Sequence, residues 1–163
     1  VVDDFFRTSQ KNIYAIGDVI DRIQLTPVAI AEAMNLVHNL ISKKKIKFNY
    51  QNIPTAVFTN PNFACVGMTE QFARKKVKSV KVFNSEFRPL RFSLSKLKDK
   101  VFVKMIINSK NGKILGLHYI GENAGEIIQG FASAIVNGLT KNDIDKTIGI
   151  HPTSAEEIVT LKK

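Results

Sequence analysis

The segment VFVKMIINSKNGKILGLHY, residues 101–119, holds two apolar runs on either side of a tight-turn signal. The runs are residues 101–107 and 113–119, and both are rich in Val, Ile, Leu or aromatic residues. The Asn111-Gly112 pair between them is typical of a β-hairpin, because both residues tolerate the positive φ angles that the turn requires. The segment therefore predicts two neighbouring antiparallel strands.

Three further strand patterns precede this hairpin. Residues 55–58 and 63–67 are apolar runs separated by the turn cluster Asn60-Pro61-Asn62. Residues 80–87 alternate between apolar and polar side chains, as a half-buried strand does. Together with the hairpin, these runs predict a sheet that is mainly antiparallel.

Short helices are predicted between and after the strands. Thr69 is placed to cap a helix that ends near Lys76, and residues 124–137 have the amphipathic spacing of a helix that ends near Gly138. A turn of helix is expected at residues 141–146. The fold class that we predict is α+β, with a mainly antiparallel sheet flanked by helices.

The N-terminal part of the chain has a different pattern. Residues 12–16 predict a short buried strand that ends at Gly17-Asp18, and a loop then runs to Leu25. Thr26 is expected to be the N-cap of a helix with Pro27 at its first position. Because the polar stretch 48–54 follows this helix, we expect two domains, residues 1–49 and 50–163.

The strand, loop and helix together suggest a ligand site. Gly17 lets the backbone pass close to a ligand, and Asp18 can accept hydrogen bonds from the hydroxyls of a ribose or ribityl chain. The helix beginning at Thr26 presents unpaired N–H groups and a positive dipole end, which suit a site that gains negative charge. An aspartate in a turn beside an ordinary capped helix is the alternative, and it is the commoner case for either piece alone.

The segment HPTSAEEIVTLKK, residues 151–163, predicts an acid/base group. Pro152 suits the first turn of a helix, and the pairs Thr153/Glu156 and Ser154/Glu157 have the spacing of capping boxes. A carboxylate five residues after His151 can reach back to an imidazole nitrogen and fix its tautomer. The segment then delivers an oriented histidine of the kind that shuttles protons. A capped helix with a chance histidine at its mouth is the alternative.

Composition narrows the classes of function. The 163 residues carry a formal net charge of +10, but the lysines and arginines occur in short scattered runs without a nucleic-acid motif, so we expect no nucleic-acid partner. No apolar run is long enough to span a bilayer, and we expect no membrane association. The single cysteine, Cys65, excludes an internal disulfide and is expected to be a small core residue.

Two motifs in the right order give the sequence a family resemblance. Residues 12–19 and 25–30 (NIYAIGDV and LTPVAI) resemble the second flavin-binding motif of pyridine-nucleotide disulfide oxidoreductases, and the chain from about Tyr50 resembles their C-terminal dimerisation domain. Residues 151–157 with 159–161 resemble the ending of glutathione reductases, and trypanothione reductases are nearly as similar. Dihydrolipoamide dehydrogenases share His-Pro-Thr but usually lack the paired glutamates.

The resemblance implies roles for particular residues. Asp18 would bind the ribityl chain of FAD, the backbone N–H of Thr26 would meet the flavin pyrimidine ring, and His151 would be the acid/base group held by Glu156. The full expected sets are Gly17, Asp18, Leu25, Thr26 and Pro27 for the cofactor, and Leu90, Glu157, Thr160 and Met34 for the substrate.

The resemblance also implies how such an enzyme works. NADPH would reduce FAD, the flavin would reduce a cysteine pair, and that dithiol would reduce oxidised glutathione in the cytoplasm. His151 would act on the partner subunit's flavin and cysteines, so a homodimer formed through residues 50–163 would be part of the active site.

Two departures from the family pattern matter. Met34 stands where glutathione reductases often have an arginine, which leaves reductases of another small disulfide such as trypanothione as an alternative. The chain has no GxGxxG loop, no nicotinamide-binding βαβ unit and no cysteine pair, so we expect it to be inactive by itself. A non-catalytic dimerisation module is therefore the other alternative.

Overall fold

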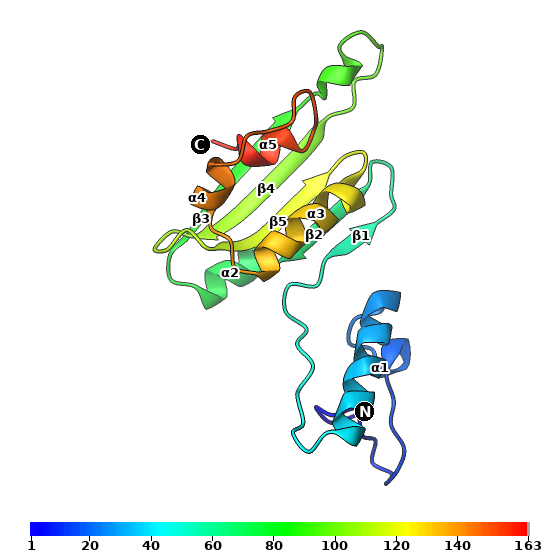
Figure 1. Cartoon of the computed structure of the whole chain (residues 1–163). Coiled ribbons are helices and arrows are strands. Elements are labelled where there is room, and N and C mark those ends of the chain that lie inside the picture. Colours follow the sequence, from blue (N-terminus) through cyan, green and yellow to red (C-terminus); the bar gives the residue numbers. More distant parts are fainter. Residues whose placement is uncertain (163) are drawn as a thin grey trace. The chain divides into compact units, whose positions relative to one another are not determined.

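The computed structural model describes residues 1–162, and the chain divides into two compact units (Figure 1). The first unit is Val1–Tyr50, and the second begins at Gln51. No helix in residues 1–162 is long and apolar enough to cross a membrane.

The first unit is built around helix α1, Thr26–Ile41, which is preceded by the short 3-10 helix η1, Gly17–Ile20. The prediction of Thr26 as the N-cap is wrong by one residue: Leu25 is the N-cap, and it offers no side-chain hydrogen bond. Pro27 is likewise one residue from its predicted place, at the second position of the helix, and it still lies in the first turn, where its missing N–H costs nothing.

The strand predicted at residues 12–16 is also wrong. Within the first unit this segment makes only an isolated bridge between Tyr14 and Arg7. A strand is defined by hydrogen bonds to a neighbouring strand, and the described residues of this unit supply a single bridging pair.

The second unit contains a five-stranded sheet in the order β1-β2-β5-β4-β3, and every neighbouring pair is antiparallel. The predicted hairpin is present, with Phe102 opposite Ile120 and Met105 opposite Leu117. The α+β prediction with its antiparallel sheet is thus confirmed. The strands are β1 Thr55–Val57, β2 Phe63–Gly67, β3 Val80–Phe87, β4 Val101–Asn108 and β5 Ile114–Ile120.

Helices cover one face of this sheet and connect its strands. Helix α3, Ala124–Val136, and helix α5, Glu156–Val159, lie over the same face (Figure 1). The predicted helices at 70–76 and 141–146 are present as α2, Glu70–Lys76, which Thr69 caps by accepting from the Phe72 N–H, and α4, Lys141–Asp145. A 3-10 turn, η2, spans Leu90–Phe92.

The core of the second unit lies between the sheet and this layer of helices. Its members come from alternate positions of β2, β4 and β5, because successive side chains of a strand point to opposite faces. The most deeply buried are Ala64, Val66, Val103, Met105, Ile114, Leu117, Tyr119, Ala124, Ile128, Ala132, Ile135, Ile158 and Leu161. Ile158 and Leu161 bring the segment after His151 into this core.

Candidate functional site

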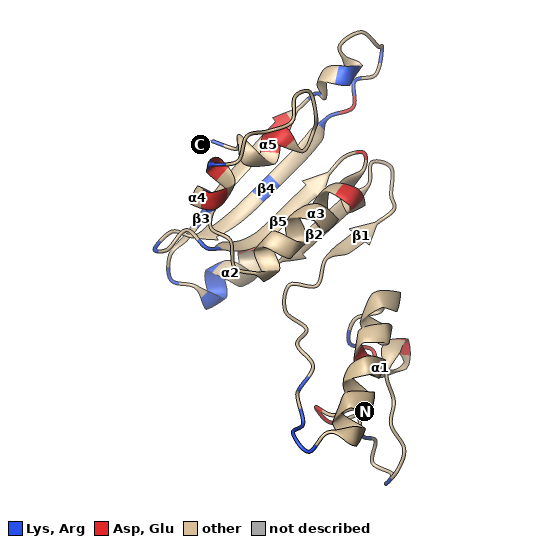
Figure 2. Ribbon diagram, in the orientation of Figure 1, with Lys and Arg blue, Asp and Glu red and all other residues tan. Residues whose placement is uncertain are grey.

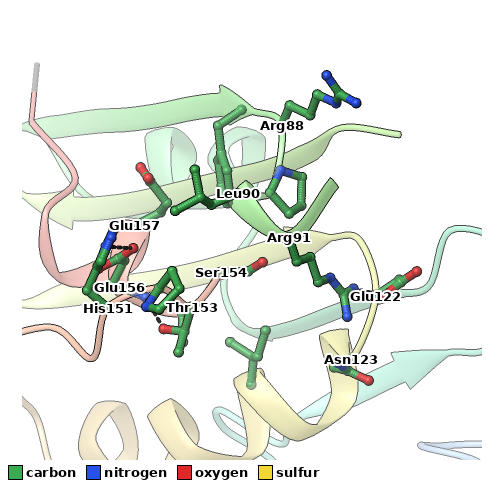
Figure 3. Close-up of a pocket in the computed structure, with 15 residues that line it drawn as sticks. Arg88, Leu90, Arg91, Glu122, Asn123, His151, Thr153, Ser154, Glu156 and Glu157 are labelled. Atoms are coloured by element: carbon green, nitrogen blue, oxygen red, sulfur yellow. Dashed lines mark hydrogen bonds and ion pairs between the residues drawn. The ribbon is translucent and has the colours of Figure 1, made fainter. Parts of the chain in front are cut away.

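The second unit has a cavity of about 460 Å³ that is lined by three separate segments (Figure 3). They are residues 87–91 at the end of β3 and after it, Glu122, Asn123 and Ile127 at the start of α3, and residues 151–157 before and in α5. The sheet and α3 hold the first two segments in place, and the core contacts of α5 hold the third. Polar and charged side chains of both signs face the same hollow.

His151 and Glu156 form a hydrogen-bonded pair at this cavity, as the sequence predicted. The His151 Nδ1 atom lies 3.0 Å from Glu156 Oε1 and 3.2 Å from Oε2. Because a carboxylate only accepts, Nδ1 carries the proton and Nε2 is left as the basic nitrogen. The imidazole is 71% exposed and the carboxylate 19%, so the ring is accessible while the carboxylate that orients it is largely covered.

The local structure around this pair departs from the predicted capping boxes. Helix α5 begins at Glu156, so the expectation that Pro152 lies in its first turn is wrong. Thr153 Oγ1 accepts the Glu156 N–H at 3.2 Å, which is half of a capping box. The other half is missing because the Glu156 carboxylate accepts from His151 instead of from the Thr153 backbone.

Close packing fixes Glu156 from its other side. A Cβ atom at Gly149 would lie 2.9 Å from the Glu156 Cβ and 3.2 Å from a methyl of Val159. Real Cβ contacts are essentially never this short, so the chain needs glycine at this position. The backbone leading to His151 therefore passes directly against the helix turn that carries its partner.

The segment after β3 forms the opposite wall of the cavity. Arg88 donates to three backbone carbonyls, at Phe92, Ser95 and Leu97, over 2.6 to 3.0 Å, and it points away from His151 (Figure 3). Arg91 instead forms an ion pair with Glu122 on the side of the cavity away from His151 (Figure 3). These charged residues were not among the predicted site residues, although the arginines lie on either side of the predicted substrate residue Leu90.

The structure brings only some of the predicted substrate residues together. Leu90, 56% exposed, and Glu157 line the cavity with His151. Thr160 is outside the set of lining residues and donates its hydroxyl to the Glu156 carbonyl. Met34 is an exposed residue of α1 in the first unit.

Burial raises the pKa of two groups in the sheet, Tyr119 and Cys65. The rise for Tyr119 is partly offset by the nearby Ser154 hydroxyl and by the charge of Arg91. Ser154 does not meet the geometry of a hydrogen bond, so the Tyr119 hydroxyl has no hydrogen-bond partner among the described residues. Burial also raises the pKa of Cys65 on β2, so its thiol stays protonated at neutral pH. The predicted place of Cys65 in the core is only partly met, because the residue is half-buried.

In the first unit the predicted cofactor residues lie at one end of α1 and in the turn before it. Gly17 has φ +71°, and a Cβ there would lie 3.2 Å from the Ala29 Cβ, so glycine allows the turn to pack against the helix. Asp18 is exposed in η1, and Leu25, Thr26 and Pro27 begin α1. An exposed carboxylate and a free helix N-terminus fit the hydroxyl chain and the electron-rich ring of a flavin.

The fold, the two-part organisation and the histidine cavity define a member of a flavoprotein class, and comparison with known proteins places the chain in it. The chain belongs to the pyridine nucleotide-disulphide oxidoreductases: the profile of their dimerisation domain matches residues 53–162, and a second profile of the same oxidoreductases matches residues 1–33.

The chain is similar to curated glutathione reductases, which confirms the resemblance seen in the sequence. It is 45% identical to that of Nostoc sp. (strain PCC 7120) over 99% of this chain and 36% of the relative. It is 47% identical to the chloroplastic/mitochondrial enzyme of Pisum sativum, again over 99% of this chain, and 45% identical to that of Burkholderia cepacia. The chain spans about a third of the length of these relatives, between 29% and 36%.

A solved structure has the same fold. The HOCl-induced flavoprotein disulfide reductase RclA from Escherichia coli matches with a TM-score of 0.85 and 26% identity, over 99% of this chain and 37% of that one.

Proposed function

We propose that this chain is the C-terminal part of an FAD-dependent glutathione-disulfide reductase that uses NADPH. The observation that carries the proposal is His151, held through Nδ1 by Glu156 with Nε2 free at a polar cavity. The chain has one cysteine, so the dithiol that reduces the substrate must come from elsewhere in the enzyme, and we expect the chain alone to be inactive.

The chemistry assigned to His151 is proton transfer during thiol–disulfide exchange. A cysteine thiolate of the enzyme attacks one sulfur of glutathione disulfide, a new S–S bond forms, and the other glutathione leaves as a thiolate. Protonated Nε2 gives its proton to that leaving sulfur, and the product thiol cannot attack back. Nδ1 keeps its proton and its hydrogen bond to Glu156 throughout. Nε2 is therefore the nitrogen that both gives and takes the transferred proton.

The cavity suits a small zwitterionic disulfide. Glu157 and Leu90 stand beside His151, whereas Arg91 and Glu122 stand at the far side (Figure 3). A glutathione half carries one ammonium and two carboxylates, and this mixture of charges matches their chemistry. We assign substrate contacts to Leu90 and Glu157, and we retain Thr160 and Met34 as proposed members of the complete enzyme's site.

We further propose that the first unit holds part of the flavin. FAD, when bound, passes electrons from NADPH to the cysteine pair. Asp18 accepts hydrogen bonds from the ribityl hydroxyls, and the N-terminal end of α1 at Leu25-Thr26-Pro27 places a positive dipole end beside the ring. Gly17 keeps the turn close enough to the helix for both contacts.

The proposed assembly is a homodimer formed through residues 50–163, in which His151 serves the partner subunit's site. An apolar groove over α3, lined by Ile127, Gly130, Phe131, Ala134 and Leu139 among others, supports a contact surface in this unit. We propose no nucleic-acid or membrane partner. Figure 2 shows basic residues spread over α2, β4 and the loops of the second unit rather than gathered on one element. A cytoplasmic location belongs to the same proposal and is tested by fractionation.

The test is NADPH oxidation by the full-length enzyme with glutathione disulfide as the sole acceptor. Rapid turnover is the expected result. A full-length protein that binds no flavin, or that binds a reducible flavin without turning over glutathione disulfide, would contradict the proposal.

A reductase of another low-molecular-weight disulfide, such as trypanothione, is the second candidate. Its motivation is Met34, which is 71% exposed and offers no charge for a substrate carboxylate. Comparing turnover of glutathione disulfide with that of cationic glutathione conjugates separates the two. A non-catalytic dimerisation module is the third candidate, motivated by the absence from this sequence of the nucleotide-binding domains and the cysteine pair, and a monomer in sedimentation would count against it.

A further inference from the structure

The first unit contains a buried carboxylate to which the sequence analysis gave no role. Glu32 lies on α1 and is 1% exposed, although charged residues are almost never fully buried unless they are paired. Removing a carboxylate from water is costly without strong hydrogen bonds, so its partners account for its burial.

Glu32 joins two segments that are distant in the sequence. Its Oε2 atom accepts the Gly17 N–H at 2.6 Å, and its Oε1 atom accepts the Tyr50 hydroxyl at 2.5 Å. Burial raises the pKa of Tyr50, and Glu32 raises it further, so the phenol keeps the proton that it donates. One carboxylate thus holds both the turn before α1 and the residue at which the first unit ends.

Arg22 supplies the balancing charge. Its Nη1 donates to the Tyr50 hydroxyl oxygen at 3.2 Å, and its guanidinium lies 5.4 Å from the centre of the Tyr50 ring. Its Nη2 also donates to the Asp3 carbonyl at 3.1 Å. The chain of bonds from Arg22 through Tyr50 and Glu32 to Gly17 is therefore complete and neutral overall, which favours a rigid arrangement.

We propose that Glu32 is a positioning residue that fixes the Gly17-Asp18 turn relative to the N-terminus of α1 and so presets the flavin site. This inference rests on the proposed function. Glu32 and Thr26 are on the same rigid helix, six residues or about 9 Å apart along its axis. A bond from Glu32 to the Gly17 backbone therefore sets the spacing between Asp18 and the helix end, the two elements proposed to contact the flavin.

A purely stabilising role for Glu32 makes a different prediction, and the chain offers a matched control. Asn39 is a second buried polar residue of α1, 6% exposed, whose amide bonds both the N–H and the carbonyl of Ile46 at 2.8 Å. Its hydrogen bonds within the described part of the chain go to Asn35 and Ile46 and not to the Gly17 turn. Asn39→Ala therefore removes buried hydrogen bonds from the same helix without touching that turn.

The experiment compares Glu32→Ala, Glu32→Gln and Asn39→Ala in the full-length enzyme. The readouts are the Kd of the apoprotein for FAD, the flavin midpoint potential, and the Tm of the apoprotein. We expect Glu32→Ala to weaken FAD binding about 10- to 100-fold, the loss typical of one hydrogen bond to a charged group. Glu32→Gln should restore most of it, since the amide oxygen still accepts from Gly17 while its NH₂ donates to the Tyr50 oxygen. Asn39→Ala should lower Tm and leave the Kd unchanged.

Two outcomes would overturn the inference: an unchanged Kd and potential in Glu32→Ala, or an equal loss of FAD affinity in Asn39→Ala at matched Tm. If Glu32→Ala does not fold, Tyr50→Phe replaces it; losing the one bond to Oε1 should weaken FAD binding about 2- to 10-fold, and no change would refute the inference. A wild-type protein without flavin would sink the proposed function itself, so the two failures are distinguishable.

Discussion

Glu156→Gln is the substitution that isolates the charge of the proposed acid/base pair. The glutamine oxygen can still accept the His151 Nδ1–H, so the ring keeps its tautomer and orientation. What is lost is the negative charge that stabilises the imidazolium. The variant therefore separates electrostatic help from positioning.

The expected magnitude follows from the geometry. A hydrogen bond to a charged acceptor is worth about 1.5–3 kcal/mol and a neutral one about 0.5–1.5 kcal/mol. The imidazole is 71% exposed, so water screens the pair and the low end of the difference applies, about 1 kcal/mol. Glu156→Gln should then slow the disulfide step about 5-fold. Glu156→Ala frees the ring and should cost about 10- to 100-fold, and His151→Ala about 10²- to 10⁴-fold.

The assay is stopped-flow spectroscopy of the full-length enzyme in its two half-reactions. Reoxidation of the NADPH-reduced enzyme by glutathione disulfide should follow the order wild type, Glu156→Gln, Glu156→Ala, His151→Ala. Reduction by NADPH should stay nearly constant. Glu157→Gln is the contrasting variant, since Glu157 lines the cavity without bonding His151, and its effect should appear in KM. Equal slowing of both half-reactions, or a wild-type rate in Glu156→Ala, would refute the acid/base assignment.

Three further predictions concern Gly149, His118 and Cys65. Gly149→Ala should slow the disulfide half-reaction about 3- to 10-fold in the same assay, because the added Cβ would displace Glu156 by a fraction of an ångström. A wild-type rate would contradict the close packing of residue 149 against Glu156. Burial lowers the pKa of His118 below its ordinary value of 6.5, so the contribution of this residue to stability is complete above pH 6.5 and is lost as the pH falls toward the folded-state pKa. The free energy of unfolding in urea should therefore decrease from pH 7.5 to pH 5. His118→Gln should make that decrease smaller. Cys65→Ser should leave turnover intact, and the native Cys65 thiol should alkylate slowly at pH 8; an inactive but folded variant would show that Cys65 takes part in the reaction.

The sheet was predictable because its signals are local. The Asn111-Gly112 turn specifies the pair of strands on either side of it, and the alternation in residues 80–87 specifies a single strand. Neither signal depends on distant parts of the chain. Strand ends differed from the predicted ones by a single residue, as at Val57 and Ile120. The strand expected at residues 12–16 failed because its apolar pattern says nothing about whether a partner strand is present.

The site was predictable only where its members are near one another in sequence. His151 and Glu156 are five residues apart, so a side-chain bond could be inferred from spacing. The same spacing argument also predicted two full capping boxes, and it could not show that the histidine and the Thr153 backbone compete for one carboxylate. In the structure the Glu156 carboxylate accepts from His151, and only the half of the capping box from the Glu156 N–H to Thr153 Oγ1 forms.

Glu32 shows what spacing cannot reveal. In the sequence it is an ordinary acidic residue on a helix, and its partners Gly17 and Tyr50 lie 15 and 18 residues away. Burial of a carboxylate depends on which segments fold over it, so only the three-dimensional arrangement identifies it. The ion pair between Arg91 and Glu122 went unnoticed for the same reason.

The insertion of Ile158 and Leu161 into the core has a consequence for biosynthesis. Every strand of the sheet precedes His151 in the chain, so on a translating ribosome the strands can pair before the histidine segment emerges. The segment that carries His151 reaches its position only when these two side chains, 0% and 2% exposed, are buried. The proton transfer proposed for His151 thus depends on prior assembly of the sheet and helices that receive these two side chains.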